Sequence, residues 1–227
     1  ADVNNDDMVD IIFGYAKRKN KLLLNDGNGT FSQAIDLPGG AIHTSSIAIA
    51  DINGDGRLDI IVGNVYHNNQ LLLNKGDGSF SIAIDLPGGK KTRSVIAADV
   101  NNDGMPDIIL GKDDAKNNVL LLNISDGKYF EVINLPGGAM ATHSLAAADV
   151  NGDGMVDIIV GNDGQKNQIL VNEGNGTYSV AMYLPGGEMN TFSVAVAATH
   201  GVSSFIVSLI LVFRSPTSRG VAGIVIE

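Results

Sequence analysis

A stretch of twelve residues recurs four times in this chain and restricts its fold more than any other feature. The copies begin at steps of 49, 48 and 50 residues, with the aspartates Asp2, Asp51, Asp99 and Asp149. Each copy continues through the same order of apolar runs, a Gly-rich turn and a Leu-Pro-Gly-Gly element. A fixed period of this length is typical of arrays of one small repeated unit. The period divides the chain into repeats 1–49, 50–97, 98–147 and 148–197, followed by 198–227.

The apolar segments within each repeat have the length of strands. They span about 4–7 residues, which is too short for helices, and they are rich in Ile, Val and Leu. Pro-Gly pairs and Gly-Asp-Gly or Gly-Asn-Gly triplets separate them, which is the chemistry of turns. Four short antiparallel strands in each ~50 residues are typical of a β-propeller blade. We therefore predict an all-β fold, a single β-propeller domain of four-stranded antiparallel blades.

The C-terminal region departs from the repeat and leaves the number of blades open. Ser193–Ala197 is in register with Ser144–Ala148, but Ala198 stands where the next aspartate would be. Three later apolar segments could be strands of a shortened fifth unit: Phe205–Val207, Ile210–Phe213 and Val221–Ile226. Alternatively, Ser193–Ala197 closes the ring beside the first repeat, or the chain is a piece of a longer propeller. We favour four intact blades and a degenerate closing unit.

The aspartate loops have the donor pattern of a calcium site. In the second copy, side-chain oxygens recur at loop positions 1, 3, 5 and 9, and Gly56 at position 6 permits a sharp turn. Position 7 can add a backbone carbonyl. Hard oxygen ligands in this number select calcium over zinc or copper. The predicted ligands are Asp2, Asn4, Asp6, Met8 and Asp10; Asp51, Asn53, Asp55, Arg57 and Asp59; Asp99, Asn101, Asp103, Met105 and Asp107; and Asp149, Asn151, Asp153, Met155 and Asp157.

The distribution of charge agrees with four bound cations. The chain has 25 acidic and 15 basic residues, for a formal charge of -10. Twelve of the acids are predicted ligands, so the rest of the chain carries +2. Three carboxylates that converge on one point repel one another unless a cation lies between them. The alternative is that the loops are ordinary Asn/Asp/Gly turns capped by their own side chains. Asp7 replaces the glycine of position 6, so the first loop is expected to bind most weakly.

These loops resemble those of the FG-GAP/VCBS repeats, which occur in integrin α-subunit propellers, some fungal lectins and many secreted microbial proteins. The resemblance covers residues 1 to about 197. It implies a propeller with one calcium ion in each intact loop, bracing neighbouring strands. The Phe-Gly signature of the integrin repeats is echoed at Phe13-Gly14 only; the other copies have Val62-Gly63, Leu110-Gly111 and Val160-Gly161.

Several functional classes are excluded or disfavoured by the composition. The chain has no Cys, so it has neither a disulfide nor a thiol nucleophile, and its acidity argues against a nucleic-acid partner. The segment Met189–Phe213 lacks formal charge, but its many Ser and Thr residues disfavour a membrane span. His43, His67, His143 and His200 show no metal spacing or nucleophile motif. We therefore predict that the chain is not an enzyme, although a His–Asp pair at His43 or His143 is conceivable.

A binding function remains, with a protein or glycan as the partner. Calcium sites of this kind are occupied at the calcium concentrations found outside cells, so we predict an extracellular, secreted or cell-surface location. The alternative function is a lectin that holds sugars between blades with aromatic and amide side chains. The lectin hypothesis draws on the following residues: Tyr15, Tyr66, Asn64, Asn68, Asn69, Asn117, Asn118, Asn162 and Asn167.

Overall fold

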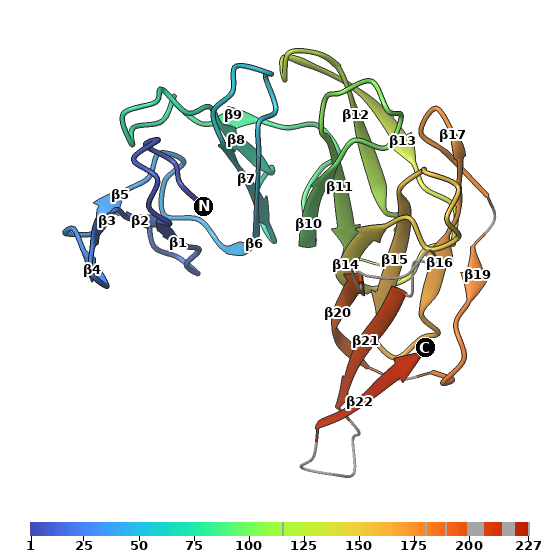
Figure 1. Ribbon diagram of the computed structural model, residues 1–227. Coiled ribbons are helices and arrows are strands. Elements are labelled where there is room, and N and C mark those ends of the chain that lie inside the picture. Colours follow the sequence, from blue (N-terminus) through green and yellow to red (C-terminus); the bar gives the residue numbers. More distant parts are fainter. Residues whose placement is uncertain (115, 180, 189, 199–206, 215–220, 227) are drawn as a thin grey trace. The chain divides into compact units, whose positions relative to one another are not determined.

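The protein is built of strands, turns and loops (Figure 1). The computed structural model describes residues 1–114, 116–179, 181–188, 190–198, 207–214 and 221–226, and no helix occurs among them. The all-β prediction is therefore confirmed at this level. The chain divides into two compact units that share the third repeat, one of residues 1–97, 105–110 and 120–132, the other of residues 98–104, 111–119 and 133–227. Each unit is described by itself below.

Three sheets of four strands follow the repeat, and the strand that precedes each aspartate loop lies at one edge of its sheet. The sheet of the second loop has the order β6 (Thr44–Ala50), β7 (Asp59–Asn64), β8 (Gln70–Leu72) and β9 (Ile84–Asp85). That of the third has the order β10 (Thr92–Ala98), β11 (Asp107–Lys112), β12 (Val119–Ser125) and β13 (Tyr129–Asn134). That of the fourth has the order β14 (Thr142–Ala148), β15 (Asp157–Asn162), β16 (Gln168–Leu170) and β19 (Met182–Tyr183).

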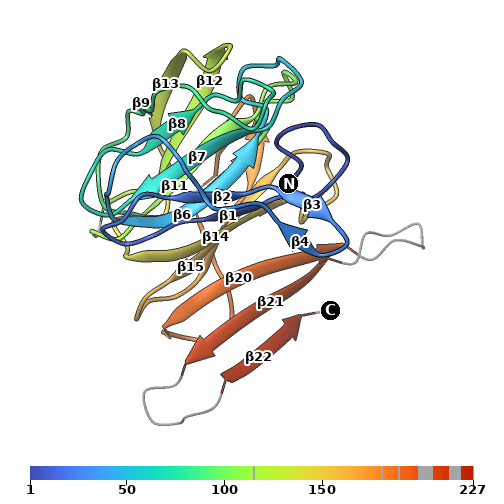
Figure 2. The same ribbon diagram turned by 90° about the vertical axis from the view of Figure 1, so that its left-hand side faces the viewer.

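Smaller sheets complete the first repeat and the C-terminal region. The first repeat forms a sheet of β1 (Ile11–Phe13), β2 (Lys21–Leu23) and β5 (Ile35–Asp36). Two short hairpins pair β3 (Asn25–Gly27) with β4 (Thr30–Phe31) and β17 (Asn172–Gly174) with β18 (Thr177–Tyr178). The C-terminal sheet consists of β20 (Thr191–Ala198), β21 (Val207–Arg214) and β22 (Val221–Ile226), which lie side by side in Figure 2.

The three segments predicted after Ala198 correspond to two described strands, because Val207 and Ile210–Phe213 lie in the same strand, β21. The predicted segments Ile210–Phe213 and Val221–Ile226 lie in β21 and β22, which pair antiparallel. Phe205, Ile206 and His200 lie outside the described residues. Strands β20 and β21 occupy much of the uncharged stretch Met189–Phe213. Within the described part of the chain, no helix is long and apolar enough to cross a membrane.

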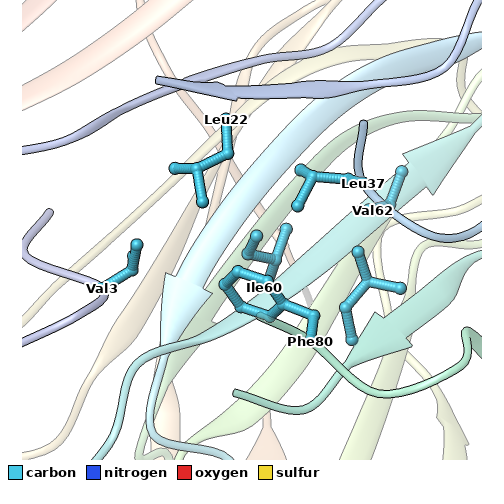
Figure 3. Close-up of a cluster of buried hydrophobic side chains, with 7 residues drawn as sticks. Val3, Leu22, Leu37, Ile60, Val62 and Phe80 are labelled. Atoms are coloured by element: carbon cyan, nitrogen blue, oxygen red, sulfur yellow. The ribbon is translucent and has the colours of Figure 1, made fainter. Parts of the chain in front are cut away.

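In the three four-stranded sheets, the second strand forms the core, because it is covered on both faces. Every residue of β7 and of β15 is buried, and Ile60, Ile61 and Val62 are at most 1% exposed. Strands covered in this way read as continuous Ile/Val/Leu runs rather than as alternating patterns. In the first unit, Ile60 and Val62 pack against Leu22 and Leu37 of the preceding repeat (Figure 3). Hydrophobic burial thus joins one repeat to the next.

A glycine in the strand that follows each aspartate loop, or directly after that strand in the first repeat, allows the next repeat to approach closely. A Cβ added at Gly14, Gly63, Gly111 or Gly161 would lie 2.8–3.2 Å from the methyl group of a threonine 29–31 residues later in the sequence. Those threonines are Thr44, Thr92, Thr142 and Thr191, and all are buried. None of the four glycines needs a positive φ. The four glycines therefore share one role, which is to leave space for the threonine methyl group of the next repeat.

Gly161→Ala should lower the stability of the chain by overpacking this contact. The new Cβ would lie 2.6 Å from Val194 and 2.8 Å from Thr191, both of which are buried in β20. Overpacking a close-packed contact typically costs about 1–3 kcal/mol. Urea unfolding would measure the loss. Gly63→Ala is the graded control, since its nearest neighbour is 3.2 Å away, and a larger loss at Gly63 than at Gly161 would contradict the explanation.

Candidate metal centre

The second, third and fourth aspartate loops connect the first strand of a four-stranded sheet to its second strand. The second loop runs from Asp51 to Asp59, between β6 and β7, and the fourth from Asp149 to Asp157, between β14 and β15. The first loop precedes β1. Since the strand before the loop and the strand after it are paired antiparallel, both ends of the loop are held by the sheet. The sheets therefore present the predicted ligands at one equivalent corner in each repeat.

The aspartate at position 9 is a buried acceptor for two backbone N–H groups. Asp59 is 0% exposed; its Oδ2 accepts from Ile52 N at 3.0 Å and its Oδ1 from Asn74 N at 2.8 Å. Asp10 and Asp157 accept in the same way from the residue at position 2 and from the asparagine that follows the next strand. Asp107 accepts from Asn123 N at 2.7 Å. This aspartate closes the loop and ties it to the third strand segment of its repeat.

The side chains at positions 1, 3 and 5 are more exposed and face the backbone of their own loop. Asp51 accepts from Asp55 N at 3.1 Å and from Gly56 N at 2.8 Å, while Asn53 Nδ2 donates to Asp55 Oδ2 at 2.9 Å. The first, third and fourth loops repeat the contact between positions 3 and 5. Among the described residues, no three His, Cys, Asp or Glu side chains form a group that could hold a metal ion. The arrangement is therefore that of self-capped turns, with oxygens available around them.

Every loop has the same backbone path, because two of its residues adopt the left-handed conformation with positive φ. Position 6 has φ of 65° at Asp7 and 82–87° at Gly56, Gly104 and Gly154. Position 4 is also left-handed, with φ of 58–79° at Asn5, Gly54, Asn102 and Gly152. The turn at position 6 was predicted from the sequence, but the left-handed conformation at position 4 was not. Its signal was the alternation of Asn and Gly there, because these two residues adopt this conformation best. Asp7 keeps the loop conformation with strain that glycine avoids, so the weaker binding expected of the first loop stays a prediction.

The loop atoms fit a cation in their chemistry. Every side-chain donor at positions 1, 3, 5 and 9 is an oxygen, which suits calcium. In the first loop, Asn4 Oδ1 is buried and has no hydrogen-bond partner, so a cation there would satisfy an acceptor that the protein leaves unpaired.

The carboxylates of one loop also influence each other. Burial raises the pKa of Asp59 above its ordinary value, whereas its bonds from Asn74 and Ile52 act in the opposite direction. The charges of Asp55 and Asp51 raise this pKa further. Asp157 in the fourth loop has a raised pKa for the same reasons, with burial again the main cause. A bound cation would remove this penalty on the ionised carboxylates.

Arg57 does more than supply a carbonyl at position 7. Its guanidinium Nη2 contacts Asp55 Oδ2 at 2.6 Å, and its Nε donates to Asn74 O at 3.2 Å. The second loop therefore contains a positive charge beside one of its predicted ligands, whereas Met stands at this position in the other three loops. A calcium ion in the second loop would compete with this ion pair for Asp55.

Two sets of asparagines, spaced by 49 residues, were not recognised as structural from the sequence. Asn20, Asn69, Asn118 and Asn167 are buried, and each Oδ1 accepts a backbone N–H at the end of the preceding strand. Asn74, Asn123 and Asn172 are buried and donate to the carbonyl of a residue 71–72 positions earlier. The sequence feature that could have identified them is the recurrence of asparagine every 49 residues at the same place in the repeat.

This burial removes most of the amides on which the lectin hypothesis depended. Asn64 and Asn162 are fully buried and use Nδ2 to bind the carbonyls of Asn68 and Lys166. With Asn69, Asn118 and Asn167, five of the seven amides are internal. Asn68 is exposed, donates to Asp85 Oδ2 at 3.1 Å and lines an open pocket of about 270 Å³. Tyr15 and Tyr66 remain partly or largely exposed.

Of the three described histidines, two pack edge-on against aromatic rings and one lines a pocket. His143 Nε2 lies 3.7 Å from Asp163 Oδ2, which is too long for a hydrogen bond, and its ring packs edge-on against Phe192. His43 packs edge-on against Tyr66, and His67 lines the pocket beside Asn68.

Comparisons with known proteins agree with the repeat. Among solved structures, the biofilm matrix protein Bap1 of V. cholerae has a TM-score of 0.55 at 18% identity, over 87% of this chain. BBS1N, solved in complex with ARL6DN, has a TM-score of 0.54 at 15% identity, also over 87% of this chain. The chain spans 30% of the length of Bap1 and 57% of that of BBS1N. At these identities the similarity shows a shared fold. Among curated proteins, none matches the sequence.

The sequence profile of the FG-GAP-like repeat matches the chain four times. The matched residues are 2–62, 51–110, 99–160 and 149–198. The first three matches each span two successive aspartate loops, and the fourth contains the loop that begins at Asp149. Because the matches together extend over residues 2–198, the chain belongs to the FG-GAP-like repeat family.

Proposed function

We propose that the chain is a calcium-stabilised, extracellular β-propeller module that binds a protein or glycan partner and catalyses no reaction. One observation carries the proposal: the same oxygen-rich loop, closed by a buried aspartate, recurs at the corner of every repeat. In this proposal each repeat is a blade, and β20, β21 and β22 form the degenerate closing unit. The orderly packing of one sheet on the next within the first unit supports this arrangement.

Calcium would act as a structural ion in these loops. The second loop offers the side-chain oxygens of Asp51, Asn53, Asp55 and Asp59 and the backbone carbonyl of Arg57, and the other loops offer the equivalent set. Both carboxylate oxygens of Asp59 already accept one N–H group, and each retains a lone pair for a cation. A loop that provides about five protein ligands leaves little room for substrate, which favours a structural role over a catalytic one.

The location and the binding role follow from the affinity and the fold. Extracellular calcium modules typically bind calcium at about 10⁻⁴–10⁻³ M, so they are filled outside cells and empty in the cytosol. The likeness in fold to a biofilm matrix protein supports a binding or adhesion role. An open pocket is one place where a partner could bind; it is lined by Ile42, His67, Asn68, Gln70, Asp85 and Lys90.

The metal content of the purified chain tests the proposal. After dialysis against calcium, we expect four calcium ions per chain, or three if the strain at Asp7 prevents binding in the first loop. Asp55→Ala should lower the ratio by one, because it removes a ligand of the second loop. Asp77→Ala is the matched control: Asp77 lies in an exposed turn of the same repeat and should leave the ratio unchanged. A ratio near zero would exclude structural calcium.

The partner class is tested separately from the metal. Retention of the calcium-loaded chain on a glycan array would identify a glycan partner, and its absence, with capture of a defined matrix protein, would favour a protein partner. Turnover of a polysaccharide that is lost in His143→Ala would contradict the non-catalytic proposal.

A further inference from the structure

Asn74 links the first and second aspartate loops by hydrogen bonds from both its side chain and its backbone. Its Nδ2 donates to Val3 O of the first loop at 2.8 Å, and its backbone N donates to Asp59 Oδ1 of the second loop at 2.8 Å. Val3 N in turn donates to Asp10 Oδ2 at 2.9 Å. All three bonds are buried. A continuous series of hydrogen bonds therefore joins the closing carboxylate of one loop to that of the next.

The same series recurs at the other asparagines of this set. Asn123 binds Ile52 O at 2.8 Å through Nδ2 and Asp107 Oδ1 at 2.7 Å through its backbone N. Asn172 binds Val100 O at 2.8 Å and Asp157 Oδ1 at 2.8 Å in the same way. In each case the carbonyl belongs to position 2 of the preceding loop, and the carboxylate to position 9 of the asparagine's own loop.

The position of the carbonyl makes this link sensitive to ligand binding. Val3 lies between Asp2 and Asn4, the first two predicted ligands of the first loop, so its peptide groups must settle when those side chains converge on a cation. Ordering Val3 orders the Asn74 side chain, and this orders the backbone N–H that holds Asp59. A second ion that binds to a loop already ordered loses less conformational entropy than the first.

We infer that Asn74 is a positioning residue that couples calcium binding in the first loop to calcium binding in the second. The inference rests on the proposed structural calcium. Filling either loop raises the affinity of the other, and cutting the side-chain bond of Asn74 removes this effect. Asn74→Ala serves that purpose well, because it removes Nδ2 and leaves the backbone bond to Asp59 in place.

Calcium titration of the full-length chain, followed by NMR, tests the coupling. With ¹⁵N-glycine labelling, the amide of Gly56 reports on the second loop, because it donates to Asp51 Oδ2. Asp6→Ala disables the first loop and should raise the calcium concentration at half-saturation of Gly56 about fivefold, the lower end of typical coupling. In an Asn74→Ala background, Asp6→Ala should leave that midpoint unchanged.

Asn69→Ala is the matched control for Asn74→Ala. Asn69 is also fully buried in the second repeat, but its side chain binds Asn64 N and Gly89 O, both within that repeat. The fivefold effect of Asp6→Ala should persist in this background. An unchanged Gly56 midpoint in Asp6→Ala alone would overturn the coupling, as would a shift that survives Asn74→Ala. If Gly56 does not respond to about 10 mM calcium, well above the usual range, the proposed function itself is wrong.

Reciprocity offers a second measurement that does not depend on the folding of Asn74→Ala. With ¹⁵N-methionine labelling, Met8 reports on the first loop, since its amide donates to Asp6 Oδ1. Disabling the second loop by Asp55→Ala should weaken calcium binding at Met8 by the same factor that Asp6→Ala produces at Gly56. A change at one loop without an equal change at the other would contradict thermodynamic coupling.

Discussion

Removal of calcium with excess EDTA should lower the melting temperature of the chain by about 12–24 °C. A ligand that binds only the folded state stabilises it by mass action, and calcium at ten times its dissociation constant contributes about 1.4 kcal/mol per loop. Before any coupling between loops is added, four filled loops then contribute about 6 kcal/mol. A chain of this length loses about 2–4 °C for each kcal/mol. Melting curves by circular dichroism, with and without EDTA, would measure the difference.

The controls separate calcium from general salt effects. Magnesium at the same concentration should restore little of the lost stability, because it demands a tighter octahedral geometry and releases its water reluctantly. Asp55→Ala should abolish one loop's share of the calcium-dependent stability. Identical melting curves in calcium and in EDTA would falsify the structural role of the ion and leave the self-capped turns as the complete description of the loops.

Asp59→Ala should destabilise the chain by about 3–5 kcal/mol even in excess EDTA. The substitution leaves Ile52 N and Asn74 N without their acceptor, and both lie in buried surroundings. An unpaired buried donor costs about 1–3 kcal/mol. Relief from burying the Asp59 carboxylate, whose pKa is raised by that burial, offsets part of the loss. Denaturant unfolding in EDTA would measure the remainder.

Two further variants make this result specific. Asp59→Asn keeps one oxygen acceptor and the size of the side chain, so it should lower the free energy of unfolding by less than Asp59→Ala does. Asp77→Ala removes an aspartate from an exposed turn of the same repeat and should have a far smaller effect. Comparable losses for Asp59→Ala and Asp77→Ala would show that the closing role of Asp59 is wrong.

The strands could be predicted from the sequence because their signals are local. Ile60, Ile61 and Val62 form an unbroken apolar run between turn residues, which identifies a buried strand without reference to the rest of the chain. The recurrence of an apolar triplet at this place in all four copies showed that the run does not occur by chance. The irregular C-terminal region was harder: two of its predicted segments lie in β21 and β22, but no loop motif marks where they begin.

The predicted ligands illustrate a different limit. Spacing alone identified Asp59 as a loop oxygen, yet its burial and its two backbone donors depend on Ile52 and on Asn74, which is 15 residues away. Arg57 was expected to contribute only main-chain oxygen, whereas its guanidinium pairs with Asp55. Asn69 and Asn118 were candidate sugar-binding amides in the lectin hypothesis, whereas in the structure both are buried and accept backbone N–H groups. A polar side chain reads the same in a sequence whether water or buried backbone surrounds it.

The sequence by itself determined the period, the all-β class, the family and the oxygen-rich loops, because each of these depends on residues close together in the chain. Only the tertiary structure decided how one repeat is attached to the next. Gly161 makes room for Thr191, and Asn74 reaches the carbonyl of Val3, 71 residues earlier. Contacts over such separations depend on the packing of one sheet against another, and packing is a property of the folded chain rather than of any local run of residues.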